Sequence, residues 1–226
     1  MKKIGLIAVL LLGSTGLFAQ EITAGNLGEF NQIVLTGKMN VVLVEGEQTG
    51  IEVILHNTEA ERFSWSVSES KLNVRLKPNT QRDGTADVKI TYKRLNALDV
   101  ASSSVRNENT ISSGIFDLKV ANGANVTLQA EAKDITVSAD GNSATTLTGN
   151  TLYLNISANS KAKIDARAME ARAAFVSTQL GAEVFVWGTE KLEAKAGSNS
   201  VIYYKGTPEI FKPTTNLMGS VEQFSY

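Results

Sequence analysis

The sequence contains no cysteine and only one histidine, His56, in 226 residues. Without cysteine, the chain cannot form a disulfide, a thiolate metal cluster, a thiol nucleophile or a lipid-modified cysteine. A single histidine cannot supply the two imidazole ligands of a common zinc site. We expect His56 to lie at a strand end rather than to act as a catalytic base. The sequence therefore predicts no metal, no other cofactor and no lipoprotein anchor.

The chain also has almost no net charge. Its 22 Lys and Arg residues nearly balance its 23 Asp and Glu residues, which leaves a formal net charge of −1. That charge is too small to favour nucleic acid or an anionic membrane surface as a partner. Hydrophobic residues make up 42% of the chain, which is ordinary for a globular protein and excludes wholesale disorder. No apolar run is long enough to predict a transmembrane segment.

Residues 1–19 have the pattern of a secretory signal peptide. Lys2 and Lys3 precede the apolar run Ile4–Leu12, and Ala19 supplies the small residue at the expected cleavage site. Removal of both lysines lowers the formal net charge from −1 by two, to −3. We predict an exported protein that is periplasmic, outer-membrane-associated or extracellular, with a single domain over residues 20–226.

An internal repeat of roughly twenty residues runs through this domain. The segment Leu118–Leu128 serves as the template, with apolar residues at its first, third, ninth and eleventh places. Copies start at positions 118, 137, 154 and 176, which are 17 to 22 residues apart. Ile33–Leu43 aligns to the template without gaps. Two further copies align if their turn is one residue shorter than in the template. They are Leu98-x-Val100 before Val105, and Ala194-x-Ala196 before Val201 and Tyr203.

Alternation with period two predicts short strands that turn one face inward. One coil cannot bury its own inward face, so coils must stack about 4.8 Å apart to pair their strands and close a core. Residues that tolerate left-handed backbone fall in the middle of the template, as sharp corners require; they are Asn122-Gly123, Asp140-Gly141, Asn159-Ser160 and Ser198-Asn199. The sequence therefore predicts an all-β protein, a single-stranded parallel β-helix with repeated coils over residues 96–226.

Residues 20–95 repeat less regularly, and we expect them to form a β cap on this end of the solenoid. The strands predicted there are Gln32–Thr36, Met39–Val44, Ile51–His56, Phe63–Val67, Lys71–Leu76 and Ala86–Lys93.

Two groups of side chains are candidates for function. Carboxylates on successive coils could act in a polysaccharide lyase or hydrolase, but their spacing does not place them in one column: Asp134, Asp140, Asp165, Glu170 and Glu183, with Arg167 nearby. Trp187, Tyr203 and Tyr204 are the ligand-binding candidates. Trp187 and Tyr204 each follow an inward position, so both should point outward and could stack on a sugar or anchor a protein. The alternative is that the C-terminal segment covers these rings.

Several segments resemble one family. Phe30-x-x-Ile33 precedes Gly37-x-x-x-Val41-x-Leu43, small-residue corners follow, and Tyr203-Tyr204-Lys205-Gly206-Thr207-Pro208 stands near the end. The chain resembles the auto-transporter adhesin head GIN domain family of exported Bacteroidetes proteins. The resemblance implies a right-handed β-helix and a cell-envelope location, and it brings no catalytic residues.

The leading hypothesis is a non-catalytic adhesin that presents a repetitive polar surface to a cell-surface glycan or to an envelope or host protein. Assembly into homo-oligomers would multiply its weak contacts. Two alternatives stay open at this point: a carbohydrate-active enzyme on the same scaffold and a purely structural envelope protein.

Overall fold

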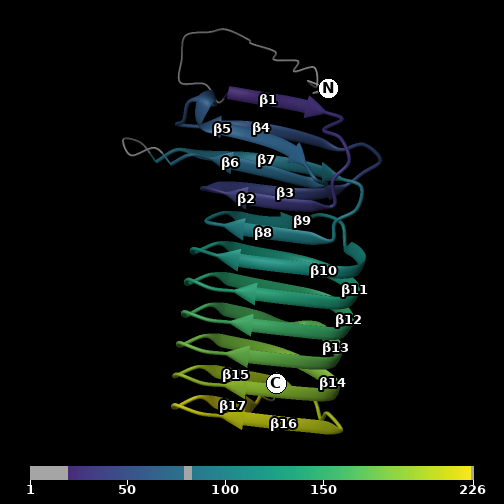
Figure 1. Ribbon diagram of the computed structural model, residues 1–226, viewed down its shortest axis with the longest axis vertical. Coiled ribbons are helices and arrows are strands. Elements are labelled where there is room, and N and C mark those ends of the chain that lie inside the picture. Colours follow the sequence, from purple (N-terminus) through teal and green to yellow (C-terminus); the bar gives the residue numbers. More distant parts are fainter. Residues whose placement is uncertain (1–19, 79–82, 225–226) are drawn as a thin grey trace.

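The computed structural model describes residues 20–78 and 83–224, and these residues are built almost entirely from β-strands (Figure 1). The signal peptide predicted for residues 1–19 lies outside this range. One 3₁₀ turn, Ala60–Arg62, is present, and none of the helical structure described is long and apolar enough to cross a membrane. The strands are β1 Gln20–Gly25, β2 Gln32–Thr36, β3 Met39–Glu45, β4 Gly50–His56, β5 Phe63–Ser68, β6 Lys71–Leu76, β7 Thr85–Tyr92, β8 Ala97–Ala101, β9 Ser104–Asn107, β10 Ile111–Ala121, β11 Asn125–Ala139, β12 Ala144–Ala158, β13 Lys163–Thr178, β14 Glu183–Ala196, β15 Val201–Lys205, β16 Ile210–Thr215 and β17 Ser220–Gln223.

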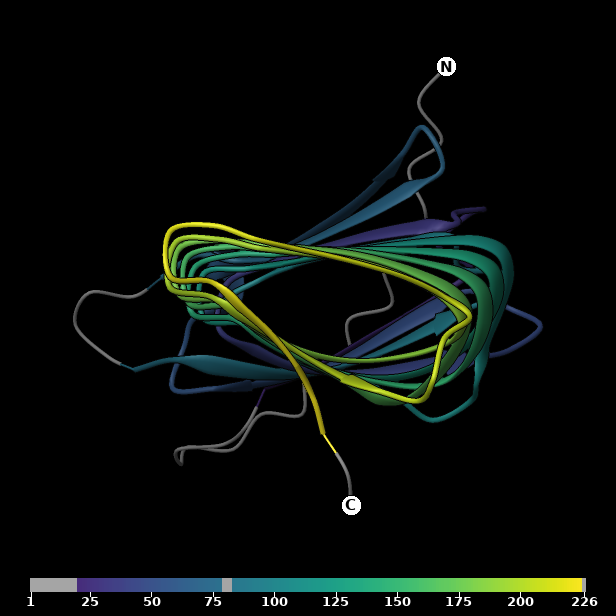
Figure 2. The same cartoon turned by 90° about the horizontal axis from the view of Figure 1, so that it is seen from below.

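The strands stack into a flattened solenoid. Seen along its axis, its cross-section has the shape of a lens, in which two sheets meet at both edges (Figure 2). The front sheet contains β2, β8, the C-terminal halves of β10 to β14, and β16, all paired in parallel. The rear sheet contains β3, β9, the N-terminal halves of β11 to β14, β15 and β17, also in parallel. Each of β11 to β14 bends from the rear sheet into the front sheet. The predicted all-β solenoid is confirmed, whereas its right-handed sense stays a prediction.

The core lies between the two sheets and follows the predicted alternation. In β11, buried and exposed residues alternate from Val126 to Ala130 and again from Ile135 to Ala139. The gap-free match of the first coil is also confirmed, because Ile33 pairs with Leu98 and Leu98 pairs with Leu118. Like residues therefore stack on like residues along the axis, and their inward faces close one continuous apolar core.

The register corrects two of the predicted copies. The copy placed at position 154 begins two residues later, because Ile156 pairs with Val137 and Val176. A shift of two leaves the same face inward, so the predicted core survives this error. In the last copy Ile202, not Val201, pairs with Val184. That error is a shift of one, and it turns every later side chain of the strand to the other face.

The sharp corners use consecutive residues with left-handed backbone. The predicted pairs Asn122-Gly123 and Ser198-Asn199 are confirmed, whereas the other two corners lie one residue later than predicted, at Gly141-Asn142 and Ser160-Lys161. Asn122 and Gly123 have φ of 55° and 72°, and the next corner has Gly141 and Asn142 at 62° and 58°. The corners also form a ladder of their own, in which the Gly123 N–H donates to the Gly141 carbonyl at 2.9 Å. Neighbouring coils are therefore tied together at their corners as well as along their strands.

The N-terminal part is a cap with an interleaved topology. All six strands predicted there are present. The coil β2–β3 lies between the coil β6–β7 and the coil β8–β9, so the chain passes over its own first coil on the way from β7 to β8. Beyond β6 and β7 the pairing becomes antiparallel, through β5 on the front sheet and through β4 and β1 on the rear sheet.

Tyr92, at the end of β7, is 2% exposed, and among the described residues its hydroxyl has no hydrogen-bond partner. Burial, with a smaller contribution from the charge of Glu45, raises the pKa of this hydroxyl from 10.0 to about 12. We expect Tyr92→Phe to raise the free energy of unfolding by about 1 kcal/mol at pH 7, because an unsatisfied buried hydroxyl is removed.

The same variant has a predictable pH dependence. Between pH 10 and 12 the unfolded wild-type chain releases the Tyr92 proton before the folded chain does, so the wild type loses stability as the pH rises. Tyr92→Phe lacks this group, so its advantage should widen from pH 7 to pH 11 in urea denaturation. A less stable variant at pH 7 would show that the hydroxyl is satisfied in solution.

Candidate binding surface

An aromatic cluster lies on the outer surface of the rear sheet near the C-terminal end of the solenoid. Phe185 and Trp187 alternate along β14 with the fully buried Val184 and Val186, so both rings point outward. Tyr203 pairs with Phe185 from the adjacent strand β15. The three rings are half-buried. We call Phe185, Trp187 and Tyr203 the outer aromatic patch.

Phe185 and Tyr203 form a stack with a charged neighbour. Their ring centroids lie 4.7 Å apart at an interplanar angle of 20°. The Arg167 guanidinium lies 4.5 Å from the Phe185 centroid and is held by a two-pronged contact with the Asp165 carboxylate. These donated hydrogen bonds lower the pKa of Asp165, so the carboxylate stays ionised and fixes the cation over the ring.

The remaining rim of the outer aromatic patch comes from β15 and the C-terminal segment. Lys205 Nζ lies 3.8 Å from the centre of the Trp187 ring and covers one face of that ring, which leaves the other face for a ligand. Phe224 meets the edge of Phe185, with centroids 5.7 Å apart and planes at 78°. The C-terminal segment thus covers one edge of Phe185, as the alternative interpretation expected in part, but Trp187 and Tyr203 stay accessible.

Tyr204 corrects one of the sequence predictions. The predicted copy took Val201 and Tyr203 as inward, whereas Ile202 is fully buried and Tyr204 packs against the core. The Tyr204 ring lies 4.7 Å from that of Phe211. Val201 and Ile202 are both apolar, so alternation alone could not choose between two registers one residue apart. Tyr204 is therefore not part of the outer surface.

Phe185 belongs to the patch although it is not among the predicted site residues. The signal was present, because Phe185 stands two residues before Trp187 and must share its face of the strand.

Of the carboxylates weighed for catalysis, Asp165, Glu170 and Glu183 lie on β13 and β14 beside the outer aromatic patch, whereas Asp134 and Asp140 lie elsewhere on the solenoid. Asp134 pairs in register with Tyr153, Asp165 lies between Thr146 and Phe185, and Glu183 lies beside Lys163. Glu170 pairs with Asn150 and Trp187, and Asp140 sits at a corner, where its side chain accepts a hydrogen bond from the Gly141 N–H. Within residues 20–78 and 83–224, no three Asp, Glu or His residues lie close enough to hold a metal ion.

His56 lies at the end of β4, as predicted. Its Nε2 is 2.8 Å from Asp87 Oδ2 on the neighbouring strand β7, and both side chains are about half exposed. This contact joins two strands of the cap.

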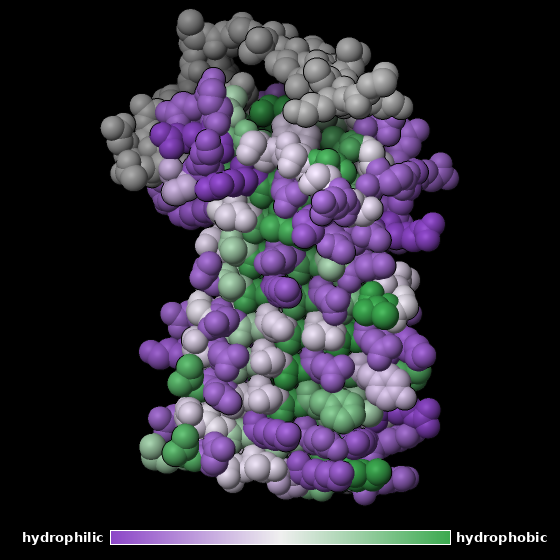
Figure 3. Space-filling model, viewed as in Figure 1, coloured by the Kyte–Doolittle hydropathy of each residue, from purple (hydrophilic) through white to green (hydrophobic). Residues whose placement is uncertain are grey.

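The front sheet presents the predicted repetitive polar surface only in part, because Ile115, Tyr153 and Phe211 are exposed on it beside the polar side chains. Ser138, Ser157 and Ser177 stack in one outward column. A shallow depression of about 260 Å³ lies along this column and includes Phe175 and Glu193. Figure 3 shows the front of the molecule as a mosaic of hydrophilic and hydrophobic residues. The depression lacks the depth and the convergent carboxylates of a catalytic cleft.

Comparisons with known proteins agree with the sequence resemblance. A family model described as putative auto-transporter adhesin, head GIN domain, matches residues 29–208. A search of curated proteins found no match.

Several solved structures share this fold. A putative adhesin from Bacteroides fragilis superposes with a TM-score of 0.79 at 19% identity, covering 90% of this chain and 97% of that one. A putative adhesin from Parabacteroides merdae has a TM-score of 0.72 at 15% identity, with 92% and 97% covered. A protein from Parabacteroides distasonis, named a putative lipid binding protein, has a TM-score of 0.69 at 18% identity, with 91% and 97% covered. At these identities the likeness shows the fold alone.

Proposed function

Because the chain belongs to the putative auto-transporter adhesin, head GIN domain family, we propose that it is a non-catalytic adhesin of the cell envelope that binds a glycan on its outer aromatic patch. The expected signal peptide supports the cell-envelope location.

The observation that carries this proposal is the outward clustering of Phe185, Trp187 and Tyr203 on adjacent strands. Clustered apolar rings on a solvated strand face are typical of a surface that binds a ligand or a partner. The C–H face of a sugar ring packs well on an aromatic face, while its hydroxyls need polar partners. Arg167, Asp165 and Lys205 supply donors and acceptors at the rim of the patch.

Binding without turnover fits this geometry, because two of the carboxylates near the patch are held in ion pairs. Asp165 is bound by Arg167, and Glu183 lies 3.6 Å from Lys163. A single patch of this size binds one sugar weakly. Several copies on one cell surface, or a homo-oligomer, would raise the overall strength of attachment through avidity.

A binding experiment tests the patch directly. We expect the double variant Trp187→Ala/Tyr203→Ala to lose at least about tenfold in affinity for the glycan that the wild type selects from a glycan array, because truncating aromatic anchors costs more than about 1 kcal/mol each. The matched control is Tyr153→Ala, which removes an aromatic ring that is 43% exposed on the front sheet. The control should bind like the wild type.

Two outcomes would contradict the proposal. Equal binding by the double variant and the wild type would remove the patch from the site. If the wild type binds no glycan but retains an envelope or host protein in a pull-down, and the double variant does not, then the ligand of the patch is a protein.

A further inference from the structure

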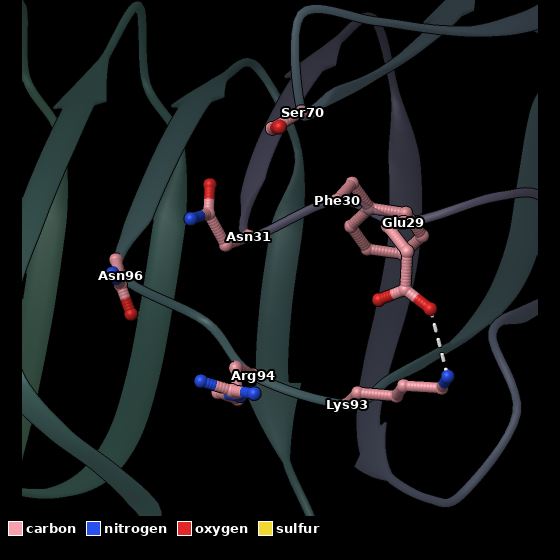
Figure 4. Close-up of a pocket in the computed structure, with 7 residues that line it drawn as sticks. All are labelled: Glu29, Phe30, Asn31, Ser70, Lys93, Arg94 and Asn96. Carbon is pink, nitrogen blue, oxygen red and sulfur yellow. Dashed lines mark hydrogen bonds and ion pairs between the residues drawn. The ribbon is translucent and has the colours of Figure 1, made fainter.

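A second hollow, of about 370 Å³, lies among the N-terminal coils, far along the solenoid axis from the outer aromatic patch. Three connecting segments surround it (Figure 4): residues 29–31 before β2, Ser70 in the turn between β5 and β6, and residues 93–96 between β7 and β8. Its volume falls in the range of small-molecule sites.

The interleaved topology holds this pocket in shape. The Asn31 N–H donates to the Ser70 carbonyl at 3.0 Å, and the Asn31 carbonyl accepts from the N–H groups of Asn96 and Ala97 at 2.8 and 3.3 Å. Ser70 has a left-handed φ of 59°. The backbone of Asn31 thus fixes the chain crossing by itself, and its side chain is left for another role.

Two groups at this pocket are available to a ligand within the described part of the chain. Asn31 Oδ1 is buried and accepts no hydrogen bond there. Arg94 is exposed and lines the same pocket; no hydrogen bond or ion pair of its side chain is recorded within the described residues, and its charge acts on the nearby Glu29 carboxylate. A buried acceptor without a donor is unfavourable, and each such group in a native structure calls for an explanation.

The charges at the pocket leave one cation in excess. Glu29 Oε1 lies 2.8 Å from Lys93 Nζ, so these two side chains neutralise each other. The hydrogen bond from Lys93 lowers the pKa of Glu29 and keeps this carboxylate ionised at neutral pH. Arg94 therefore supplies the net positive charge.

We propose that this pocket binds an acidic sugar, such as the uronic acid residue of a glycan. The sugar carboxylate would pair with the Arg94 guanidinium, whose planar fork matches a carboxylate. A sugar hydroxyl would donate to Asn31 Oδ1, which a simple carboxylate cannot do. A neutral sugar could satisfy Asn31 but would form no ion pair with Arg94. This site is independent of the outer aromatic patch.

Calorimetric titration of the purified protein with three probes tests the assignment. We expect D-glucuronate to bind at least about tenfold more tightly than D-glucose or acetate, because only glucuronate carries both groups. Arg94→Gln should weaken glucuronate binding at least about tenfold. Arg106→Gln, which alters an exposed arginine on the rear sheet, is the matched control and should bind like the wild type.

Asn31→Ala separates a binding role from a structural one. The variant keeps the backbone hydrogen bonds of the crossing and loses the unpartnered acceptor, so it should bind glucuronate more weakly without a loss in melting temperature.

The proposal is overturned if glucuronate does not bind, if glucose binds as tightly, or if Arg94→Gln binds unchanged. Loss of glucuronate binding in Trp187→Ala/Tyr203→Ala, with Arg94→Gln unaffected, would move the acidic sugar to the outer aromatic patch. Retained glucuronate binding in that double variant supports the pocket, whatever the fate of the patch proposal.

Discussion

Replacing Gly149 by alanine is expected to lower the free energy of unfolding by about 3–5 kcal/mol. Gly149 lies in β12 with a φ of +119°, a conformation that residues with a side chain rarely adopt. A Cβ placed there would be 2.1 Å from the Ala130 carbonyl oxygen of the adjacent coil. Because that atom belongs to the backbone of the paired strand β11, it cannot swing aside as a side chain would.

The matched control is Gly114→Ala in β10. A Cβ at Gly114 meets no atom within 4 Å, and its backbone is not left-handed. This variant should therefore unfold within about 0.5 kcal/mol of the wild type. Urea denaturation followed by circular dichroism compares the three proteins. Equal midpoints for Gly149→Ala and Gly114→Ala would show that the stack can open locally to admit a methyl group.

Phe116→Ala is expected to cost about 3–5 kcal/mol, since it removes a large side chain from a packed interior and leaves a cavity. Phe116 is 0% exposed in β10 and pairs with Ile135 of the next coil. Both sheets and the coils above and below confine this position, so the surrounding side chains can collapse into the space only in part.

The adjacent residue provides the control for this prediction. Ile115 is 57% exposed, so Ile115→Ala should shift the free energy of unfolding by no more than about 0.5 kcal/mol. The contrast between neighbours tests the alternation that defines the coil. Similar losses for both variants in urea denaturation would mean that β10 does not present one face inward and the other outward.

A repeat protein can respond to such changes by opening part of the stack, because each coil contacts only its neighbours. Two optical probes at different ends would report this, such as Trp65 in the cap and Trp187 in the outer aromatic patch. Coincident transitions would indicate that the solenoid unfolds as one unit.

Both candidate sites depend on the rigidity of the solenoid. Phe185 and Tyr203 stack because β14 and β15 are paired in register, and Arg94 and Asn31 share a pocket because the chain crosses its first coil. Neither site needs a long loop to close around a ligand. A scaffold of this kind pre-organises its ligand-binding groups and lowers the entropy lost on binding.

The sequence by itself determined the class of fold and most of the core. Alternation of apolar and polar residues is a local property, and it assigned Ile33, Leu118 and Val126 to the interior before any pairing was known. The spacing of the copies indicated stacked coils, because one coil of this length cannot bury its own face. The outward orientation of Trp187 followed from the same alternation.

Only the tertiary structure decided the register and the order of the coils. A strand that carries apolar residues at two successive positions fits two registers equally well, which is why Tyr203 and Tyr204 exchanged faces between prediction and structure. The pocket around Asn31 brings together residues 29–31, 70 and 93–96. Their meeting depends on the insertion of the coil β2–β3 between two later coils, which is a long-range pairing choice that no local pattern in the chain records.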